Sequence, residues 1–531
     1  MNGDRATTEP AHGYTGERPP AGFNMARYCI GRSARARGGH PALVVVHDAD
    51  APVEDAERWT YAQLDDAVRA VAAGLLREGL VPGDRVMLRM GNTSDYALLF
   101  FGAIAAGIVA LPSSAMLTPG EASFLISDSA AEAVAVAPEL SLDALDALDA
   151  GGLRLIGAED LARWRAGPER IDYADTAADD PAFLVYTSGT TGKPKGVLHA
   201  HRSAWGRRPM YEGWYGLRPD DVMLHAGAFN WTYTLGVGLT DPWANGATAI
   251  VYNGAKDPTV WARIIEAHRA TLFAAVPGVF RQLLHHGAWD AHDLSSLRHG
   301  LTAGEALRPA LLERWRAATG TELYEALGMS ECSTYVSSSP SVPIKPGSPG
   351  RPQAGRCVAI IPAARADGDE PLPPNTTGLL AVHRSDPGLM LGYWNRPQEA
   401  AEVFRGDWFV GGDLAELDDE EYLFYHGRND DVMNPMGYRV SPLEVEAALN
   451  EHPDVADVAV TELAVKEGVS VVAAFVVPAP GGARDPAALM AYAAARLARY
   501  KCPREVRYVD ALPRTANGKL RRRDLAAPAD G

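Results

Sequence analysis

Short apolar segments alternate with amphipathic helical segments over much of this 531-residue chain. The stretch "TYAQLDDAVRAVAAGLLREGL" places Leu64, Val68, Val71 and Leu75 on one helical face, and the strand-like "GDRVMLRM" follows it. The same alternation returns at "TAIVYNG", "PTVWARIIEAHRA" and "TLFAAVP". Because alternating strands and helices form mostly parallel sheets covered on both faces, we predict an α/β fold.

Local signals set the limits of several of these elements. Thr60 and Gln63 have the spacing of a capping box, and Gly79 ends the helix that they open. "SDYALLFFGAIAAG" is interpreted as a buried helix and "IVALP" as the strand after it. Residues 139–152, which are rich in Ala and Asp, are interpreted as a solvated helix.

The character of the sequence changes after about residue 340. Pro- and Gly-punctuated stretches separate short strand-like segments there, which predicts an antiparallel β region. A last unit contains a helix opened by Ser441, the strands "VADVAV" and "VVAAFVV", and a second helix around "PAALMAYAAARLARY". We therefore expect a disordered tail at 1–22, a large domain at 23–429 and a small, mobile α+β domain at 430–531, as the length also favours.

Composition excludes several classes of function. A net charge of −17 without an offsetting basic stripe argues against a nucleic-acid partner. The N-terminus lacks the apolar core of a signal peptide, and the longest uncharged run is shorter than the roughly 20 residues of a membrane span. We expect a cytoplasmic protein without a membrane segment. Its four cysteines have neither metal-type nor disulfide-framework spacing: Cys29, Cys332, Cys357 and Cys502.

A loop rich in hydroxyl, glycine and lysine residues follows the apolar run "PAFLV". This loop, "YTSGTTGKPKG", offers backbone amides, hydroxyls and ammonium groups, which suit a polyphosphate. A flexible surface loop is the alternative. The Walker A pattern fails, because Thr187 occupies its first glycine position and Pro194 follows Lys193. A P-loop NTPase is therefore excluded.

Three further motifs follow this loop in order. They are "YEALGMSE", "WFVGGDLAELDDEEYLFYHGRNDD" and "PRTANGK". With the loop, they resemble the AMP-forming adenylating superfamily of acyl-CoA synthetases, peptide-synthetase adenylation domains and luciferases. The resemblance runs from about Phe23 to Leu525, and "TAGEALRP" and "GVLHAH" look most like benzoate-type aryl-CoA ligases.

The resemblance implies a set of residues that bind ATP or AMP. In this family Mg²⁺ is associated with an acidic residue, here Glu331, and an oxygen ligand suits that hard cation. Leu327 stands where many members carry a tyrosine that stacks on adenine, and Ser330 replaces a threonine. The implied nucleotide-binding residues are Thr187, Ser188, Gly189, Thr190, Thr191, Gly192, Lys193, Ala303, Gly304, Glu305, Glu325, Ala326, Leu327, Gly328, Ser330, Asp413, Arg428 and Lys519.

The resemblance also assigns catalytic and CoA-binding residues. Thr187, Glu331 and Lys519 are the expected catalytic residues, and Asp430 is the expected hinge. One pose of the last domain would bring Lys519 to the site for adenylation. The other would bring in the CoA-binding loop of Gly437, Tyr438 and Arg439.

The acid pocket is expected around "FNWTYTLG". Asn230, Trp231, Thr232 and Tyr233 are the candidates, together with Gly328, although aromatic residues at this spacing also suit an ordinary core. Bulky aromatic side chains favour a short or flat acid over a long chain. His225 is a further candidate. His199, His201 and His225 are too scattered to favour a metal site.

The resemblance therefore implies an AMP-forming carboxylic acid–CoA ligase that uses ATP, Mg²⁺ and CoA. Its acid is expected to be a small aromatic, benzoate-like acid or one of short or medium chain length, and a homodimer is compatible with the family. A stand-alone adenylation enzyme that loads a carrier protein is the main alternative. A non-catalytic nucleotide-binding regulator is a third, disfavoured by the presence together of Glu331, Asp413, Arg428 and Lys519.

Overall fold

The structure is a computed structural model of the chain. It describes residues 13–137, 153–187, 194–255, 257–286, 289–429, 433, 440–466, 469–497, 499, 501–514 and 520–526. The chain divides into two compact units, one of residues 1–358 with 382–407 and the other of residues 359–381 with 408–531. The predicted hinge at Asp430 and the predicted helix at 139–152 lie outside the described residues.

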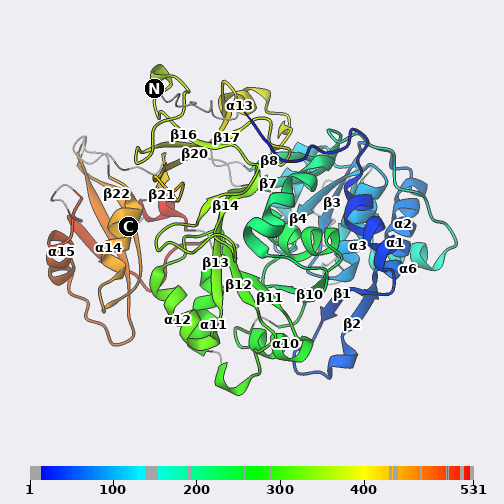
Figure 1. The fold of residues 1–531 in the computed structure, drawn as a ribbon, viewed down its shortest axis with the longest axis horizontal. Coiled ribbons are helices and arrows are strands. Elements are labelled where there is room, and N and C mark those ends of the chain that lie inside the picture. Colours follow the sequence, from blue (N-terminus) through cyan, green and yellow to red (C-terminus); the bar gives the residue numbers. More distant parts are fainter. Residues whose placement is uncertain are drawn as a thin grey trace, which may run out of the picture. The chain divides into compact units, whose positions relative to one another are not determined.

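A nine-stranded sheet forms one half of the larger unit (Figure 1). Its six central strands are parallel, and antiparallel strands complete both edges. In spatial order the strands are β15 (Arg351–Pro352), β14 (Ser333–Ser337), β13 (Glu322–Met329), β12 (His299–Ala303), β11 (Leu272–Ala275), β9 (Val222–His225), β10 (Thr248–Tyr252), β1 (Pro41–Val46) and β2 (Glu57–Thr60).

A seven-stranded sheet forms the other half of this unit. Its strands β7, β4, β3, β5 and β6 are parallel neighbours, whereas β8 pairs antiparallel with β7 and β18. In spatial order the strands are β18 (Gly392–Tyr393), β8 (Lys195–Ala200), β7 (Pro181–Thr187), β4 (Val109–Ser113), β3 (Arg85–Arg89), β5 (Ala133–Val136) and β6 (Arg154–Ile156).

The largest hydrophobic core lies between these two sheets. Successive strand residues point to opposite faces, so in β1 Val45 enters this core while Val44 enters a second one. In β3, Val86 enters the same large core and Met87 enters a third. Both sheets are therefore buried on both faces, as the alternating sequence predicts.

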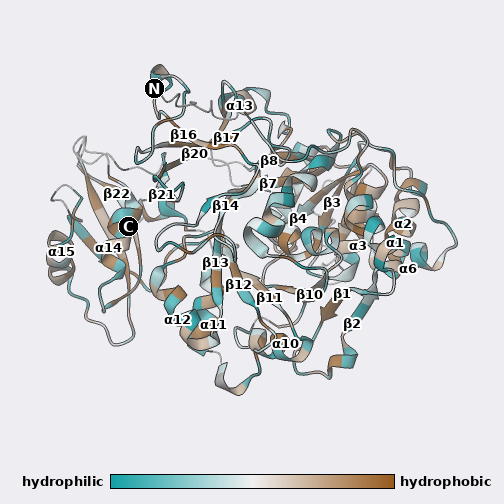
Figure 2. Ribbon diagram, viewed as in Figure 1, coloured by the Kyte–Doolittle hydropathy of each residue, from teal (hydrophilic) through white to brown (hydrophobic). Residues whose placement is uncertain are grey.

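Helices fill the layers around the sheets. α2 begins after Thr60 with the predicted capping box, and it packs with α3 in the large core. Figure 2 shows hydrophobic residues along the strands and hydrophilic ones on the outer faces of helices such as α12. The helices of this unit are α1 (Arg32–Arg37), α2 (Tyr61–Arg77), α3 (Ser94–Ala105), α4 (Pro119–Ser129), α6 (Ala158–Ala166), α7 (Arg208–Met210), α8 (Thr232–Leu235), α9 (Asp241–Ala244), α10 (Val260–His268), α11 (Pro277–His286), α12 (Pro309–Thr319) and α13 (Pro397–Glu402).

Two smaller sheets follow, as the change in sequence after residue 340 predicts. A five-stranded sheet contains β16 (Val358–Ile361), β17 (Gly378–His383), β20 (Trp408–Leu417), β19 (Phe404–Arg405) and β21 (Leu423–Arg428). The last sheet contains β22 (Val455–Lys466), β23 (Val469–Pro478) and β24 (Glu505–Tyr508). Helices α14 (Pro442–Asn450), α15 (Pro486–Ala494) and α16 (Arg522–Ala526) accompany it. α14 and α15 pack on one face of this sheet, which gives the expected small α+β fold.

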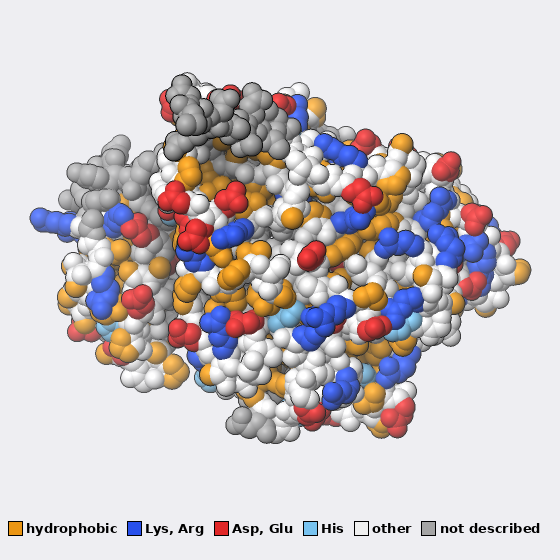
Figure 3. Space-filling view, in the orientation of Figure 1, with side chains coloured by type: hydrophobic (Ala, Val, Ile, Leu, Met, Phe, Trp, Pro, Cys, Tyr) orange, Lys and Arg blue, Asp and Glu red, His pale blue; other side chains and the backbone are white. Residues whose placement is uncertain are grey.

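In the described part of the chain, no helix is both long enough and apolar enough to cross a membrane. On the face drawn in Figure 3, acidic and basic side chains are interspersed.

Candidate active site

Predicted nucleotide and acid residues meet at the carboxyl ends of β12 and β13. Ala303 ends β12 and pairs in register with Ala326 of β13, and both side chains pack in one core with Tyr233 and Trp231. Gly304 follows with φ +92°, where a Cβ would lie 2.9 Å from the Trp231 ring. Only glycine fits this conformation and this close approach. The structure therefore places these five predicted residues together.

Glu325 and Glu305 lie beside this edge of the sheet. The Glu325 carboxylate accepts a 2.8 Å hydrogen bond from the Leu307 backbone N–H, which braces the loop after Gly304. Burial raises the pKa of Glu325 to about 8, although this hydrogen bond lowers it. Glu305 lies 4.0 Å from Arg281. Glu325 thus positions the loop that the sequence assigns to adenine.

The turn after β13 is held by contacts to its backbone and side chains. His199 Nε2 donates to the Ser330 carbonyl at 2.8 Å. Tyr393 donates its hydroxyl to Glu331 Oε1 at 2.8 Å, and the Met390 N–H donates to the Glu331 carbonyl at 2.8 Å. The candidate Mg²⁺ ligand is therefore held at a fixed position.

Two further predicted residues on β13 differ in their surroundings. Leu327 is half-buried and pairs with Val336 of β14. A Cβ on Gly328 would lie 2.3 Å from the Ser333 carbonyl oxygen, so the approach of the two strands requires glycine.

The residues near Glu331 fit a Mg²⁺ ion that is held mainly through substrate phosphates. Within the described residues, no group of three or more His, Cys, Asp or Glu side chains could hold a metal alone. A single carboxylate, Glu331, is what Mg²⁺ usually takes from a protein when phosphates supply other ligands.

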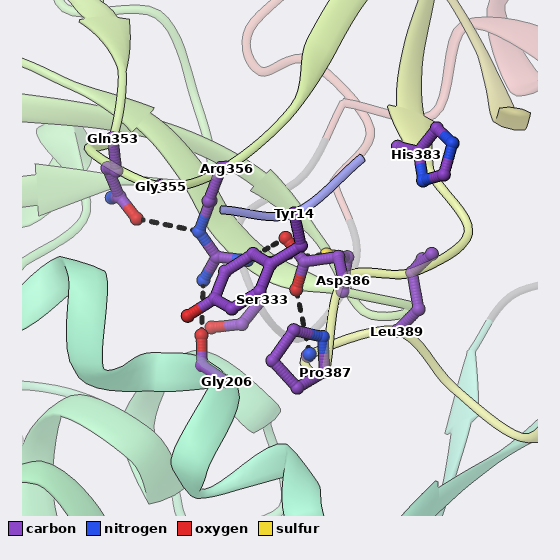
Figure 4. Close-up of polar contacts among 12 residues, drawn as sticks. Tyr14, Gly206, Ser333, Gln353, Gly355, Arg356, His383, Asp386, Pro387 and Leu389 are labelled. Carbon is purple, nitrogen blue, oxygen red and sulfur yellow. Dashed lines mark hydrogen bonds and ion pairs between the residues drawn. The ribbon is translucent and has the colours of Figure 1, made fainter. Parts of the chain in front are cut away.

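A buried arginine, Arg356, lies beside the same turn (Figure 4), and its Nη1 lies 3.8 Å from the Cys332 sulfur. Arg356 forms a 2.7 Å ion pair with Asp386, and it also donates to Gln353 Oε1 at 3.0 Å and to the Gly206 carbonyl at 2.7 Å. The Gly388 N–H donates to Asp386 at 2.7 Å. This network joins three distant chain segments.

The acid-side residues are partly core and partly surface. Tyr233 is buried. Its ring packs edge-on against the rings of Trp231 and His225, with ring centres 5.1 and 4.7 Å apart. Asn230, Trp231 and Thr232 are half-buried. Tyr233 therefore belongs to the core, whereas its three neighbours are partly exposed and their role in acid binding stays a prediction.

A small cavity of about 30 Å³ with a mainly apolar lining and several polar groups lies beside Thr232. Among its polar lining residues are His199, Ser203, Arg207, Thr232, Ser330 and Ser333. Sequence reasoning missed Arg207 as a site residue, and it considered His199 only as a metal ligand. No local pattern marks Arg207. His199 lies in the motif "GVLHAH", but its partner, the Ser330 carbonyl, is distant in sequence.

The phosphate loop is described only at its ends. Thr187 ends β7 and pairs in register with Lys195 of β8. Lys195 forms an ion pair with Glu399, and its Nζ lies 5.4 Å from the centre of the Tyr393 ring. Lys195 therefore serves the packing of β8. Ser188, Gly189, Thr190, Thr191, Gly192 and Lys193 lie outside the described residues.

In the smaller unit the two predicted ribose ligands lie side by side. Asp413 of β20 pairs in register with Arg428 of β21, and their side chains approach to 3.7 Å. Tyr425 donates its hydroxyl to the same carboxylate at 3.0 Å. Asp430, Gly437, Tyr438, Arg439 and Lys519 lie outside the described residues, so their roles stay predictions.

Two regions of the chain match known protein families. Residues 31–394 match the AMP-binding enzymes, and residues 444–519 match the AMP-binding enzyme C-terminal domain. The chain is 32% identical over 536 residues to the benzoate–CoA ligase of Thauera aromatica, covering 98% of each chain. It is 31% identical over 518 residues to the 3-hydroxybenzoate–CoA ligase of Aromatoleum sp. (strain CIB), covering 94% of this chain and 97% of the relative. The crystal structure of a benzoate CoA ligase from Burkholderia xenovorans LB400 superposes with a TM-score of 0.84 at 29% identity, over 95% of this chain and all of that one.

Proposed function

This chain belongs to the AMP-binding enzymes, within their AMP-forming acyl- and aryl-CoA ligases, and from that premise we propose that its acid is a small, benzoate-like aromatic acid. The observation that carries the proposal is the half-buried Trp231, which lies against Gly304 where the predicted nucleotide and acid residues meet. A flat ring fits beside such an aromatic wall. Relatives named for benzoate and 3-hydroxybenzoate support the same class.

The chemistry requires that negative charge be cancelled and two groups be aligned. The acid carboxylate attacks the α-phosphorus of ATP, pyrophosphate leaves, and the acyl-AMP then passes its acyl group to a thiol as AMP departs. Mg²⁺ bound through Glu331 and the phosphates would offset part of this charge. Residues 187–193 would hold the phosphates, and Asp413 with Arg428 would hold the ribose.

The last domain would supply different groups to the two steps. Lys519 would stabilise the developing charge during adenylation. A rotation at Asp430 would then bring Gly437, Tyr438 and Arg439 to the site for the CoA thiol. Free CoA is the proposed acceptor, and a carrier-protein phosphopantetheine is the alternative.

Pyrophosphate release with a panel of benzoates and of short, medium and long aliphatic acids tests the proposed acid. Benzoates should give the highest kcat/KM, and long-chain acids the lowest. Thioester formation with CoA, and separately with a carrier protein, distinguishes the two acceptors. Release of no pyrophosphate with any acid would favour the non-catalytic regulator.

The two half-reactions of Lys519→Ala test the proposed mechanism. Adenylation should fall by about 10²–10³-fold, the usual scale for one preorganised electrostatic contact. Thioester formation from prepared acyl-AMP should change much less. An equal fall in both steps would contradict the assignment of Lys519 to the first step.

A further inference from the structure

The wall of the cavity beside Thr232 is mostly apolar but carries several polar groups, and the cavity has room for a small group. Its volume is about 30 Å³, and Thr232 and Ser330 line it together with Arg207 and His199. A space of roughly 10–15 Å³ measured in this way holds one water molecule. The cavity can therefore take a substituent about the size of a hydroxyl group.

His199 presents a hydrogen-bond acceptor in this wall. Its Nε2 donates to the Ser330 carbonyl at 2.8 Å, so Nε2 carries the proton and Nδ1 keeps its lone pair. Stacking on Phe183, with ring centres 4.6 Å apart, fixes the ring. The side chain is buried at 3% exposure, and Nδ1 has no partner in the part of the chain that the structure describes. A buried acceptor of this kind calls for a donor.

Arg207 supplies donors to the cavity without supplying net charge. Its Nε and Nη2 donate to the two oxygens of Asp241 at 2.8 and 2.7 Å. Tyr215 donates its hydroxyl to Asp241 at 2.7 Å, and Arg207 Nη1 donates to the Ser333 hydroxyl. Because the Asp241 carboxylate neutralises the guanidinium, the cavity favours a neutral polar group over a carboxylate or an ammonium group.

We propose that this cavity receives a ring hydroxyl of the acid substrate, which donates to His199 Nδ1 and accepts from the hydroxyl and guanidinium donors around it. The inference rests on the proposed benzoate-like acid and names its substituent. A hydroxyl fits better than an amino group, because the nitrogen lone pair of an aromatic amine is delocalised and accepts hydrogen bonds poorly. A methyl group of similar size would leave His199 Nδ1 without a donor.

Adenylation of matched substituted benzoates tests the proposal with the wild-type enzyme. Benzoate and its 2-, 3- and 4-hydroxy and 2-, 3- and 4-methyl forms are compared by kcat/KM for pyrophosphate release. At one ring position the hydroxy acid should exceed its methyl counterpart about tenfold or more, because a site built around a hydroxyl rejects an analogue without it. Equal use of hydroxy and methyl acids at all three positions would overturn the proposal.

His199→Gln tests the role of Nδ1 itself. The glutamine amide can still donate to the Ser330 carbonyl, but it offers no acceptor in the place of Nδ1. The hydroxy-to-methyl ratio should fall about tenfold, whatever happens to the absolute rates. The matched control is His299→Gln, since His299 is also buried and its Nε2 donates to the Tyr215 carbonyl at 2.8 Å outside the cavity. That control should keep the wild-type ratio.

The outcomes separate this inference from the proposed function. If no benzoate is adenylated, the proposed function fails. If benzoate and methylbenzoates react and hydroxyl groups bring no gain, only the assignment of the cavity fails. An unchanged ratio in His199→Gln would likewise remove His199 from substrate recognition, and the wild-type comparison decides the question even if the variant does not fold.

Discussion

Two buried arginine–aspartate pairs in the larger unit have similar geometry and different surroundings. Arg356 and Asp386 lie 2.7 Å apart with side chains 0% and 1% exposed. Arg207 and Asp241 also lie 2.7 Å apart, with side chains 10% and 0% exposed. The contacts that surround each pair show what it does.

The hydrogen bonds of the Arg356–Asp386 pair all go to backbone groups and neighbouring side chains of the protein. Arg356 reaches the Gly206 carbonyl and Gln353, and Asp386 accepts from the Gly388 N–H. Three segments that are distant in sequence are thereby joined around one guanidinium (Figure 4). The role of this pair is structural.

The Arg207 pair has one side facing the cavity. Arg207 and Ser333 both line the cavity, and Asp241 and Tyr215 hold the guanidinium from behind. Burial alone would lower the pKa of Arg207, but Asp241 and Tyr215 raise it above its usual value, so the charge persists. A buried charge therefore suggests recognition when a cavity adjoins it, and a structural role when backbone groups surround it.

Breaking the Arg356–Asp386 ion pair should give the largest loss of stability. Asp386→Ala leaves the Arg356 guanidinium buried without its counter-ion, which usually costs about 3–5 kcal/mol. The thermal unfolding transition should move down strongly, as followed by calorimetry. The exposed pair of Arg37 and Asp220 gives the control, since Asp220→Ala should cost about 1 kcal/mol or less. Equal shifts in the two variants would mean that Arg356 and Asp386 do not anchor the fold.

Removing one hydrogen bond from the Arg207–Asp241 pair should give a smaller loss in the free energy of unfolding. Tyr215→Phe removes a 2.7 Å hydrogen bond to the Asp241 carboxylate, and a bond to a charged group contributes about 1.5–3 kcal/mol. Tyr96→Phe is the matched control, because it removes a 3.0 Å bond to the neutral Phe229 carbonyl, worth about 0.5–1.5 kcal/mol. Chemical denaturation of both variants measures the difference. A larger loss in Tyr96→Phe would contradict a charged network around Arg207.

The hydrogen bond from Tyr393 supports the candidate Mg²⁺ ligand, Glu331. Tyr393→Phe removes the 2.8 Å hydrogen bond that orients the Glu331 carboxylate. Groups that orient a metal ligand typically change metal affinity about tenfold or more. The Mg²⁺ concentration for half-maximal pyrophosphate release should therefore rise about tenfold. Tyr252→Phe, which removes a bond to the Ala255 carbonyl, should leave it unchanged.

The sequence predicts the elements of this fold because their signals are local. The capping box of Thr60 and Gln63 and the apolar face of α2 are both present as expected. Asp413 and Arg428, predicted to act together, pair across β20 and β21. The helix follows from capping and periodicity within a short segment, whereas the pairing of Asp413 with Arg428 follows from the resemblance to a family motif.

The two arginine pairs could not be predicted in the same way. Arg207 and Asp241 are 34 residues apart, and Arg356 and Asp386 are 30 apart. In sequence each is an ordinary charged residue of a loop or a helix end. Their burial arises only when tertiary packing brings distant segments of the chain around each pair. Tyr233 shows the same limit, since the tertiary packing alone distinguishes it from the half-buried Trp231.

The smallest expected effect is on the pH dependence of stability. Together with the hydroxy-to-methyl ratio, it distinguishes His199, which lines the cavity, from His299, which does not. Burial lowers the pKa of His199 to about 4, with smaller contributions in the same direction from Arg202 and Arg207 and an opposing one from the Ser330 hydrogen bond. The unfolded chain takes up a proton near pH 6.5, whereas the folded chain does so only near pH 4, so the stability contribution is present above pH 6.5 and is lost as pH falls toward 4. Between pH 6.5 and 4 the free energy of unfolding falls as pH falls, with a slope set by the number of protons taken up on unfolding. His199→Gln should reduce that number by about one and so make the fall less steep. His299→Gln should do the same, because burial lowers the pKa of His299 to about 4 as well. Only His199→Gln should also change the hydroxy-to-methyl ratio, since only His199 lines the cavity. If both variants changed the slope and the ratio together, the discrimination would come from general core packing and not from the His199 side chain.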